Sequence, residues 1–135
     1  MANPLTFTIF TEPTAKGRAR ATWVNGKAHT YTPEKTRDAE TDIKCQIINS
    51  GIQGFAQGVP LKLEAIFYRT RPKSLPKRVI LPVSKPDATN YLKGLEDAME
   101  DLLYPNDSQI TTVVAKKRYG YPPRVEVKLS EDDGG

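Results

Sequence analysis

Carboxylate side chains concentrate in one short part of this 135-residue chain. Residues 87–107 contain Asp87, Glu96, Asp97, Glu100, Asp101 and Asp107, with Lys93 as the one basic residue among them. Oxygen ligands of this kind bind Mg²⁺ or Mn²⁺, and a nearby cation can offset charge on a phosphate group. The segment is therefore a candidate site for metal-assisted chemistry at a phosphate ester.

Basic residues gather in separate segments around this acidic one. The three basic clusters are Lys16, Arg18, Arg20, Lys27, Lys35 and Arg37; Arg69, Arg71, Lys73, Lys77, Arg78 and Lys85; and Lys116, Lys117 and Arg118. Cations that neutralise a polyanion, beside carboxylates that collect divalent metal, are what cutting a nucleic acid requires. The alternative is that these charged residues are only the solvent-exposed faces of helices and loops. Their clustering favours binding to a nucleic acid.

Length and composition exclude several classes of protein. A chain of 135 residues with 38% hydrophobic and 27% charged residues suits one globular domain, and no apolar run is long enough to cross a bilayer. The first ten residues lack an export signal, so we expect a cytoplasmic protein without a membrane partner. With only Cys45 and His29, the usual zinc cages cannot form, so any metal must be held by oxygen.

The pattern of apolar residues predicts an α+β domain with a mixed β-sheet and two main helices. Strands are expected at about 5–11, 21–24, 27–32, 61–68, 110–115 and 125–129, and helices at about 33–50 and 89–104. Asn25-Gly26 indicates a tight hairpin turn. A long loop is expected at 70–84, and residues 131–135 form an acidic flexible tail after a domain of residues 1–130.

The helices are expected to bury one stripe each. In the first helix the stripe is Ala39, Ile43 and Ile47 with Ile48 beside them, and in the second it is Leu92, Leu95, Met99 and Leu102. The second helix lies between Asp87 and Asp107. If the strand after this helix returns beside the strand before it, we expect the two aspartates to converge on a Mg²⁺ or Mn²⁺ site with Lys93 nearby.

Several motifs match one known family. They are Lys85–Lys93 (KPDATNYLK), Glu96–Met99 (EDAM), Tyr104 with Asn106–Ile110 (NDSQI), and the earlier Lys16–Arg20 (KGRAR) and Tyr31–Thr36 (YTPEKT). In these motifs the chain resembles the RusA-type Holliday junction resolvases over nearly the whole domain. The resemblance implies a homodimeric, Mg²⁺-dependent endonuclease that binds four-way DNA junctions and nicks two opposed strands.

The resemblance also assigns roles to residues. It implies that Asp87 and Asp107 are metal ligands and catalytic residues, and that Lys93 is the catalytic cation near the scissile phosphate. It also implies a supporting role for Asn90. The basic residues Lys16, Arg18, Arg20, Arg71, Lys73, Lys77 and Arg78 are the candidates for DNA phosphate contacts.

Thr89 departs from the family pattern, which has aspartate two residues after the first. A neutral hydroxyl removes one negative charge from the expected metal site. Glu96 lies seven residues along the same helix face, and Asp97 lies four residues after Lys93, so either is a candidate for the missing charge and a metal ligand. The alternative for Glu96 is an ordinary solvated carboxylate.

Two other functions stay open at this point. In the first, the metal site no longer binds an ion because Thr89 stands where the family has an aspartate, and the protein binds junctions without cutting them. Alternatively, the charged clusters would serve protein assembly or RNA binding, and a four-way junction would then be bound no better than linear duplex.

Overall fold

The computed structural model describes residues 3–15, 20–31 and 34–135. Its elements are β1 (Leu5–Ile9), β2 (Arg20–Val24), β3 (Lys27–Tyr31), α1 (Glu34–Ser50), β4 (Leu61–Arg69), α2 (Ala88–Met99), the short 3-10 helix η1 (Asp107–Gln109), β5 (Ile110–Tyr119) and β6 (Arg124–Glu131). Their order confirms the predicted α+β class, with a mixed sheet and two main helices.

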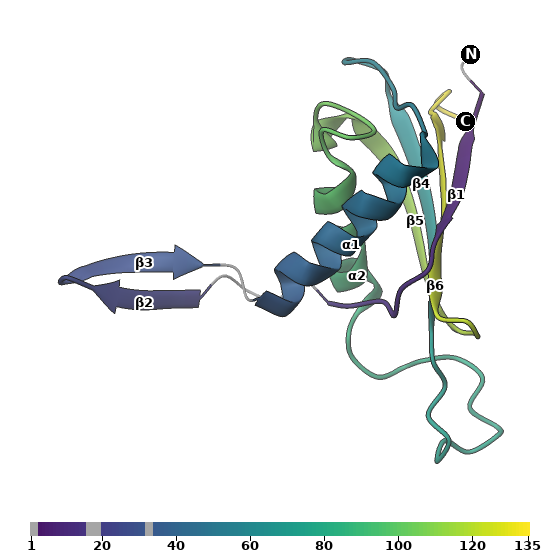
Figure 1. The fold of residues 1–135 in the computed structure, drawn as a ribbon. Helices are drawn as coiled ribbons and strands as arrows, with labels where there is room; N and C mark the ends of the chain where they lie inside the picture. Colours follow the sequence, from purple (N-terminus) through teal and green to yellow (C-terminus); the bar gives the residue numbers. More distant parts are fainter. Residues whose placement is uncertain (1–2, 16–19, 32–33) are drawn as a thin grey trace.

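The main sheet has the strand order β1-β6-β4-β5, and both helices cover one of its faces (Figure 1). β6 pairs antiparallel with β1 and with β4, whereas β5 pairs parallel with β4. Parallel neighbours need a crossover connection, and α2 lies within the one here. The strand after α2 therefore does return beside the strand before it, which was the condition for Asp87 and Asp107 to converge.

The core forms between the covered face of the sheet and the helices. β4 alternates regularly and buries Leu61, Leu63, Ala65 and Phe67, and β6 buries Val125, Val127 and Leu129. Ile43 and Ile47 of α1 are buried against this layer as predicted. The prediction for Ile48 is wrong, because a step of about 100° around the helix from Ile47 leaves its side chain 62% exposed.

α2 is shorter than the sequence pattern predicts, since it ends at Met99 and not near residue 104. Asp101 has a left-handed backbone with φ of 69°, and its N–H donates to the carbonyl of Tyr104. The Phe55 N–H donates to the Leu103 carbonyl, and the Leu103 side chain is buried. The apolar residues after Met99 therefore reach the core from a turn, which satisfies the same pattern as a longer helix.

The ends of the shorter elements follow local rules. Asn25 and Gly26 both adopt positive φ between β2 and β3, as a two-residue hairpin turn requires. At the other end of the chain, Asp132 accepts hydrogen bonds from the hydroxyls of Thr111 and Thr112, and its N–H donates to Pro60. Contacts with the sheet thus continue two residues past the predicted domain boundary at 130.

Among the described residues, neither α1 nor α2 meets the length and apolarity needed to span a bilayer.

Candidate metal and nuclease site

Three carboxylates meet beside the C-terminal end of α2. Asp97 lies in the last turns of α2, Glu100 follows the helix directly, and Asp107 begins η1. One oxygen from each lies within 4.8 Å of the other two, and all three residues are half-buried. Three converging carboxylate oxygens form a donor set for a hard divalent cation.

The turn between α2 and β5 fixes the position of Asp107. The Asn106 side chain accepts a hydrogen bond from the Ser108 N–H at 2.9 Å, and the Gln109 side chain accepts one from the Asn106 N–H at 3.2 Å. The Gln109 amide also donates to the carbonyls of Ala56 and Val59. Because Gln109 is buried and its amide is fully engaged, η1 and the Asp107 carboxylate are held against the domain.

The electrostatics of Asp107 favour a cation. Partial burial and then the negative charge of Glu100 raise the pKa of Asp107, and the opposing effect of Lys93 is smaller. Its Oδ1 atom is shielded from solvent and has no hydrogen-bond partner. An acceptor of this kind is costly to bury, and a bound cation would satisfy it. The three carboxylates therefore fit the divalent metal that the sequence predicts.

Tyr104 forms the buried floor of this site. Its side chain is 1% exposed, and its hydroxyl donates to the carbonyl of Glu96 at 3.2 Å. Burial, followed by the negative charge of Asp107, raises the pKa of Tyr104. The phenol is therefore neutral at physiological pH.

Lys93 and Glu96 border the three carboxylates from α2. The Lys93 Nζ lies 3.6 Å from Asp97 Oδ1, one helical turn away, and the Lys93 side chain is 58% exposed. Burial and then the charge of Asp107 raise the pKa of Glu96, so Glu96 interacts with the site electrostatically. Within the described part of the chain, however, the group of three converging oxygens does not include Glu96.

Asp87 lies at the opposite end of α2, where it is the N-cap residue. Ten residues separate it from Asp97, which corresponds to about 15 Å of helical rise. The expected convergence of Asp87 and Asp107 is therefore not found within one chain. The reason is topological: β5 runs parallel to β4, so α2 must run back along the sheet, and the residues that flank α2 are left at its two ends.

Asp87 nevertheless has an available carboxylate. Its backbone carbonyl accepts the N–H groups of Asn90 and Tyr91, whereas its side chain forms no capping hydrogen bond and is exposed. An N-cap aspartate normally uses its carboxylate on the first helical turn. Thr89 and Asn90 are also exposed in this turn.

Glu100 is not among the metal ligands predicted from the sequence, although it belongs to the converging group. Its signal was present, because Glu100 lies three residues after Asp97 and residues at that spacing are neighbours on a helix surface. The prediction that α2 continues to residue 104 gave no reason to prefer Glu100 over Glu96. The turn that follows Met99 brings the Asp107 N–H within 3.4 Å of Glu100 Oε1.

The predicted DNA-binding residues are described only in part. Lys16 and Arg18 lie outside the described residues, and Arg20 begins β2 with its side chain outside the description. Lys73, Lys77 and Arg78 are exposed on the long loop between β4 and α2. Arg71 is half-buried and donates to the carbonyls of Pro76 and Val79, so it stabilises this loop from within.

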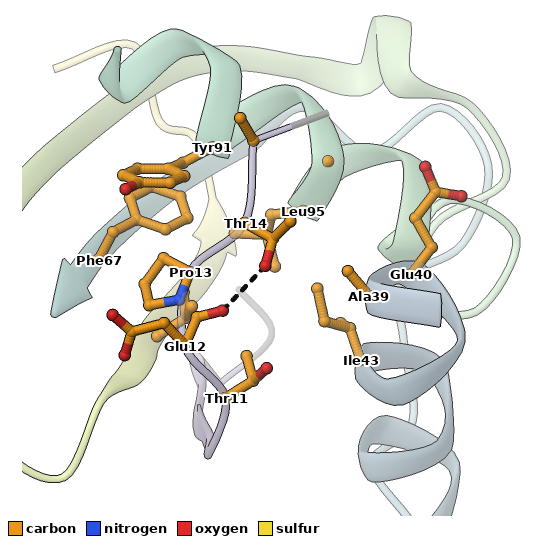
Figure 2. A pocket seen from close by; sticks show the side chains of 13 residues that line it. Thr11, Glu12, Pro13, Thr14, Ala39, Glu40, Ile43, Phe67, Tyr91 and Leu95 are labelled. Atoms are coloured by element: carbon orange, nitrogen blue, oxygen red, sulfur yellow. Dashed lines mark hydrogen bonds between the residues drawn. The ribbon is translucent and has the colours of Figure 1, made fainter. Parts of the chain in front are cut away.

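A small pocket lies elsewhere, between α1, α2 and residues 11–15 (Figure 2). Phe67, Tyr91 and Leu95 supply much of its apolar wall, and Thr14 donates a hydrogen bond to the Glu12 carbonyl at its rim. Its cavity volume is about 20 Å³. That volume holds one or two waters and no part of a nucleic acid, and the residues that line it do not include Asp97, Glu100 or Asp107.

The two glutamates beside Asp107 are expected to differ in their effect on metal binding. Glu100→Gln removes an oxygen of the converging group, so the Mg²⁺ concentration that gives half-maximal activity should rise by about tenfold or more. Glu96→Gln removes only a neighbouring charge, and its shift should stay below about threefold. Metal titrations of the two variants measure both values, and a larger shift for Glu96→Gln would contradict the assignment of Glu100.

The raised pKa of Asp107 predicts a pH dependence of stability without metal. A carboxyl group with a higher pKa in the folded than in the unfolded state destabilises the fold as pH rises through the folded pKa. Asp107→Asn removes this penalty. In EDTA, the melting temperature of the variant should therefore gain on that of the wild type as the pH rises from about 4, the ordinary range of an aspartate, through the raised pKa of Asp107. A difference in melting temperature that is constant across this range would contradict the prediction.

The chain is similar to one protein family and to individual proteins of known sequence. The family model of Endodeoxyribonuclease RusA matches residues 11–130. The chain is 33% identical over 135 residues to the uncharacterized protein YqaN of Bacillus subtilis (strain 168), with 93% of this chain and 94% of that protein covered. It is also 31% identical over 121 residues to the crossover junction endodeoxyribonuclease rusA of Lactococcus phage r1t, with 88% and 90% covered.

Proposed function

Because this chain belongs to the RusA family of endodeoxyribonucleases, we propose that it is a Mg²⁺-dependent nuclease that resolves four-way DNA junctions by paired, symmetric nicks during recombination and repair. The observation that carries this proposal is the group of Asp97, Glu100 and Asp107, which the family match spans. A two-fold homodimer would match the symmetry of the junction. The relatives come from a bacterium and a phage, which supports action in a bacterial cytoplasm.

The proposed metal ligands are Asp97, Glu100 and Asp107, with Mg²⁺ or Mn²⁺ as the ion. When bound, such an ion acidifies water and offsets phosphate charge. In this arrangement Asp97 and Glu100 supply the carboxylates beside Asp107, at the end of α2 opposite Thr89. Asp97 therefore keeps the role that the sequence analysis offered it, and Glu96 becomes a neighbouring charge and not a ligand.

Lys93 is proposed as the cation that faces the phosphate. Its side chain is mostly exposed, and Asp97 at 3.6 Å restrains its ammonium group beside the acidic site. The ammonium group can offset negative charge as it builds on the phosphoryl oxygens or on the leaving oxygen. The roles of Asp87 as a catalytic residue and metal ligand stay predictions from the sequence. Its exposed carboxylate makes no capping hydrogen bond and would meet the DNA strand at the other end of α2.

The deciding experiment incubates the protein with an end-labelled four-way junction, with and without Mg²⁺, and maps the nicks on each strand. The proposal expects nicks at symmetric positions on two opposed strands in Mg²⁺ and none in EDTA. Junction binding without nicking at any Mg²⁺ or Mn²⁺ concentration would favour a non-catalytic binding protein. Equal affinity for the junction and for linear duplex would overturn junction selectivity.

The exposed loop lysines are expected to contact DNA phosphates. Lys73→Gln and Lys77→Gln should each flatten the slope of log affinity against log salt concentration by about one unit. The reason is that each lysine releases counterions from one phosphate. Lys44→Gln, at an exposed position of α1, is the matched control and should leave the slope unchanged. Binding is measured in Ca²⁺ at several salt concentrations, and unchanged slopes for both loop variants would assign the contacts elsewhere.

A further inference from the structure

Two cations hold the backbone that leads into Asp87. Arg69, at the end of β4, donates from Nη2 to the Ser84 carbonyl at 3.0 Å and from Nη1 to the Lys85 carbonyl at 3.2 Å. Lys117, on β5, donates from Nζ to the carbonyls of Ser84 and Pro86, both at 3.1 Å. Three successive carbonyls directly before Asp87 are therefore all bound to side-chain cations.

Arg69 is unusually buried for a charged residue, with 9% of its surface exposed. Besides the two carbonyls, it donates to the Ser84 hydroxyl at 2.9 Å and to the Tyr91 hydroxyl at 3.2 Å. Its guanidinium also lies 5.7 Å from the ring centroid of Tyr119. Burial of a guanidinium is tolerated only when its donors are well used, and here they connect the strand end, the loop and α2.

In the part of the chain that the structure describes, the hydrogen-bond partners of both cations are carbonyl and hydroxyl groups. Within the ranges that the structure describes, no carboxylate lies within ion-pair distance of Arg69 or Lys117. The charged donors of both cations are therefore used on the backbone directly before Asp87, and hydrogen bonds from charged donors are stronger than those from neutral ones.

We infer that Arg69 and Lys117 are positioning residues that fix the Ser84–Pro86 backbone and thereby present Asp87 to the DNA strand. This inference rests on the proposed nuclease function. Arg69 and Lys117 reach the same segment from two adjacent parallel strands, so the segment is tied to the rigid part of the sheet. Asp87 is then oriented by the fold and not by a capping bond of its own.

The test uses Lys117→Met, which removes the donors and retains the length of a half-buried side chain. Cleavage of a saturating four-way junction in Mg²⁺ should slow by about tenfold, whereas the junction Kd in Ca²⁺ should change by less than about threefold. Lys117→Arg should restore most of the rate. Lys44→Met, at an exposed lysine of α1 outside the basic clusters, is the control and should leave both values unchanged.

Amide hydrogen exchange supplies a readout that is independent of cleavage. Exchange in peptides that contain Ser84, Lys85 and Asp87 should accelerate in Lys117→Met, while exchange in β4 and β6 should stay at the wild-type level. Unchanged exchange and an unchanged rate would overturn the inference. A parallel loss of rate and affinity with a flatter salt slope would also overturn it, because it would make Lys117 a DNA contact.

Arg69→Lys extends the test to the buried cation and is interpreted only with its melting temperature and exchange pattern. If the wild type shows no nicking, the nuclease proposal fails while the exchange result still decides whether the cations hold the segment. If Lys117→Met slows cleavage but Asp87→Asn does not, the two cations do not act through Asp87, and the inference is overturned although the nuclease function stands.

Discussion

Asp107→Asn is expected to reduce junction nicking by at least about 10²–10³-fold while leaving junction affinity in Ca²⁺ nearly unchanged. Asp107 is the central carboxylate of the proposed metal site, since its Oδ1 is shielded and has no hydrogen-bond partner, and both Asp97 and Glu100 approach it. An asparagine retains the shape but presents a neutral oxygen to the metal. The rate is measured under single turnover with saturating protein.

Asp101→Asn is the matched control for this experiment. Asp101 is an exposed acid in the same turn, and its backbone φ of 69° is one that asparagine also adopts readily. The control should nick at the wild-type rate. If Asp107→Asn cuts junctions as fast as the control, the three carboxylates are not the metal site.

Lys93→Met is expected to lower the rate of nicking by about 10²-fold, with little change in junction affinity. A cation that acts on charge developing in the transition state contributes to kcat more than to ground-state binding. The variant keeps the length of the side chain and loses only the charge. Its rate at saturating junction and its Kd in Ca²⁺ are measured separately.

Two comparisons make the Lys93 result specific. Lys44→Met, at an exposed lysine of α1, should behave as the wild type. Lys93→Arg retains the charge with a different geometry and should recover part of the rate. A drop in affinity as large as the drop in rate would make Lys93 an ordinary phosphate contact.

The two expected effects probe different parts of one site. Asp107 is held by the Asn106 and Gln109 hydrogen bonds of η1, whereas Lys93 is restrained only by Asp97 and is mostly exposed. The proposed metal ligand is thus fixed by the fold, and the proposed catalytic cation keeps the freedom to meet a phosphate. We therefore expect metal titration to distinguish the two variants. Only Asp107→Asn should raise the Mg²⁺ concentration that gives the half-maximal rate of nicking.

The sequence was informative about α2 and its surroundings up to a definite point. Apolar spacing predicted Leu95 and Met99 as core residues, and both are buried. The same spacing extended the helix to residue 104, because Leu102, Leu103 and Tyr104 continue an apolar pattern. A turn that packs Leu103 and Tyr104 into the core satisfies that pattern equally well, and local propensity cannot distinguish the two arrangements.

The amino-acid sequence by itself determined the α+β class, the order of the elements, the separation of acidic and basic segments, and the family. Those properties depend on residue types and short-range spacing. Only the tertiary structure decided which carboxylates meet. The parallel pairing of β4 with β5 makes α2 run back across the sheet, which separates Asp87 from Asp107, and the turn after Met99 brings Glu100 and Asp107 to Asp97. Such meetings arise from long-range strand pairing, which no local pattern encodes.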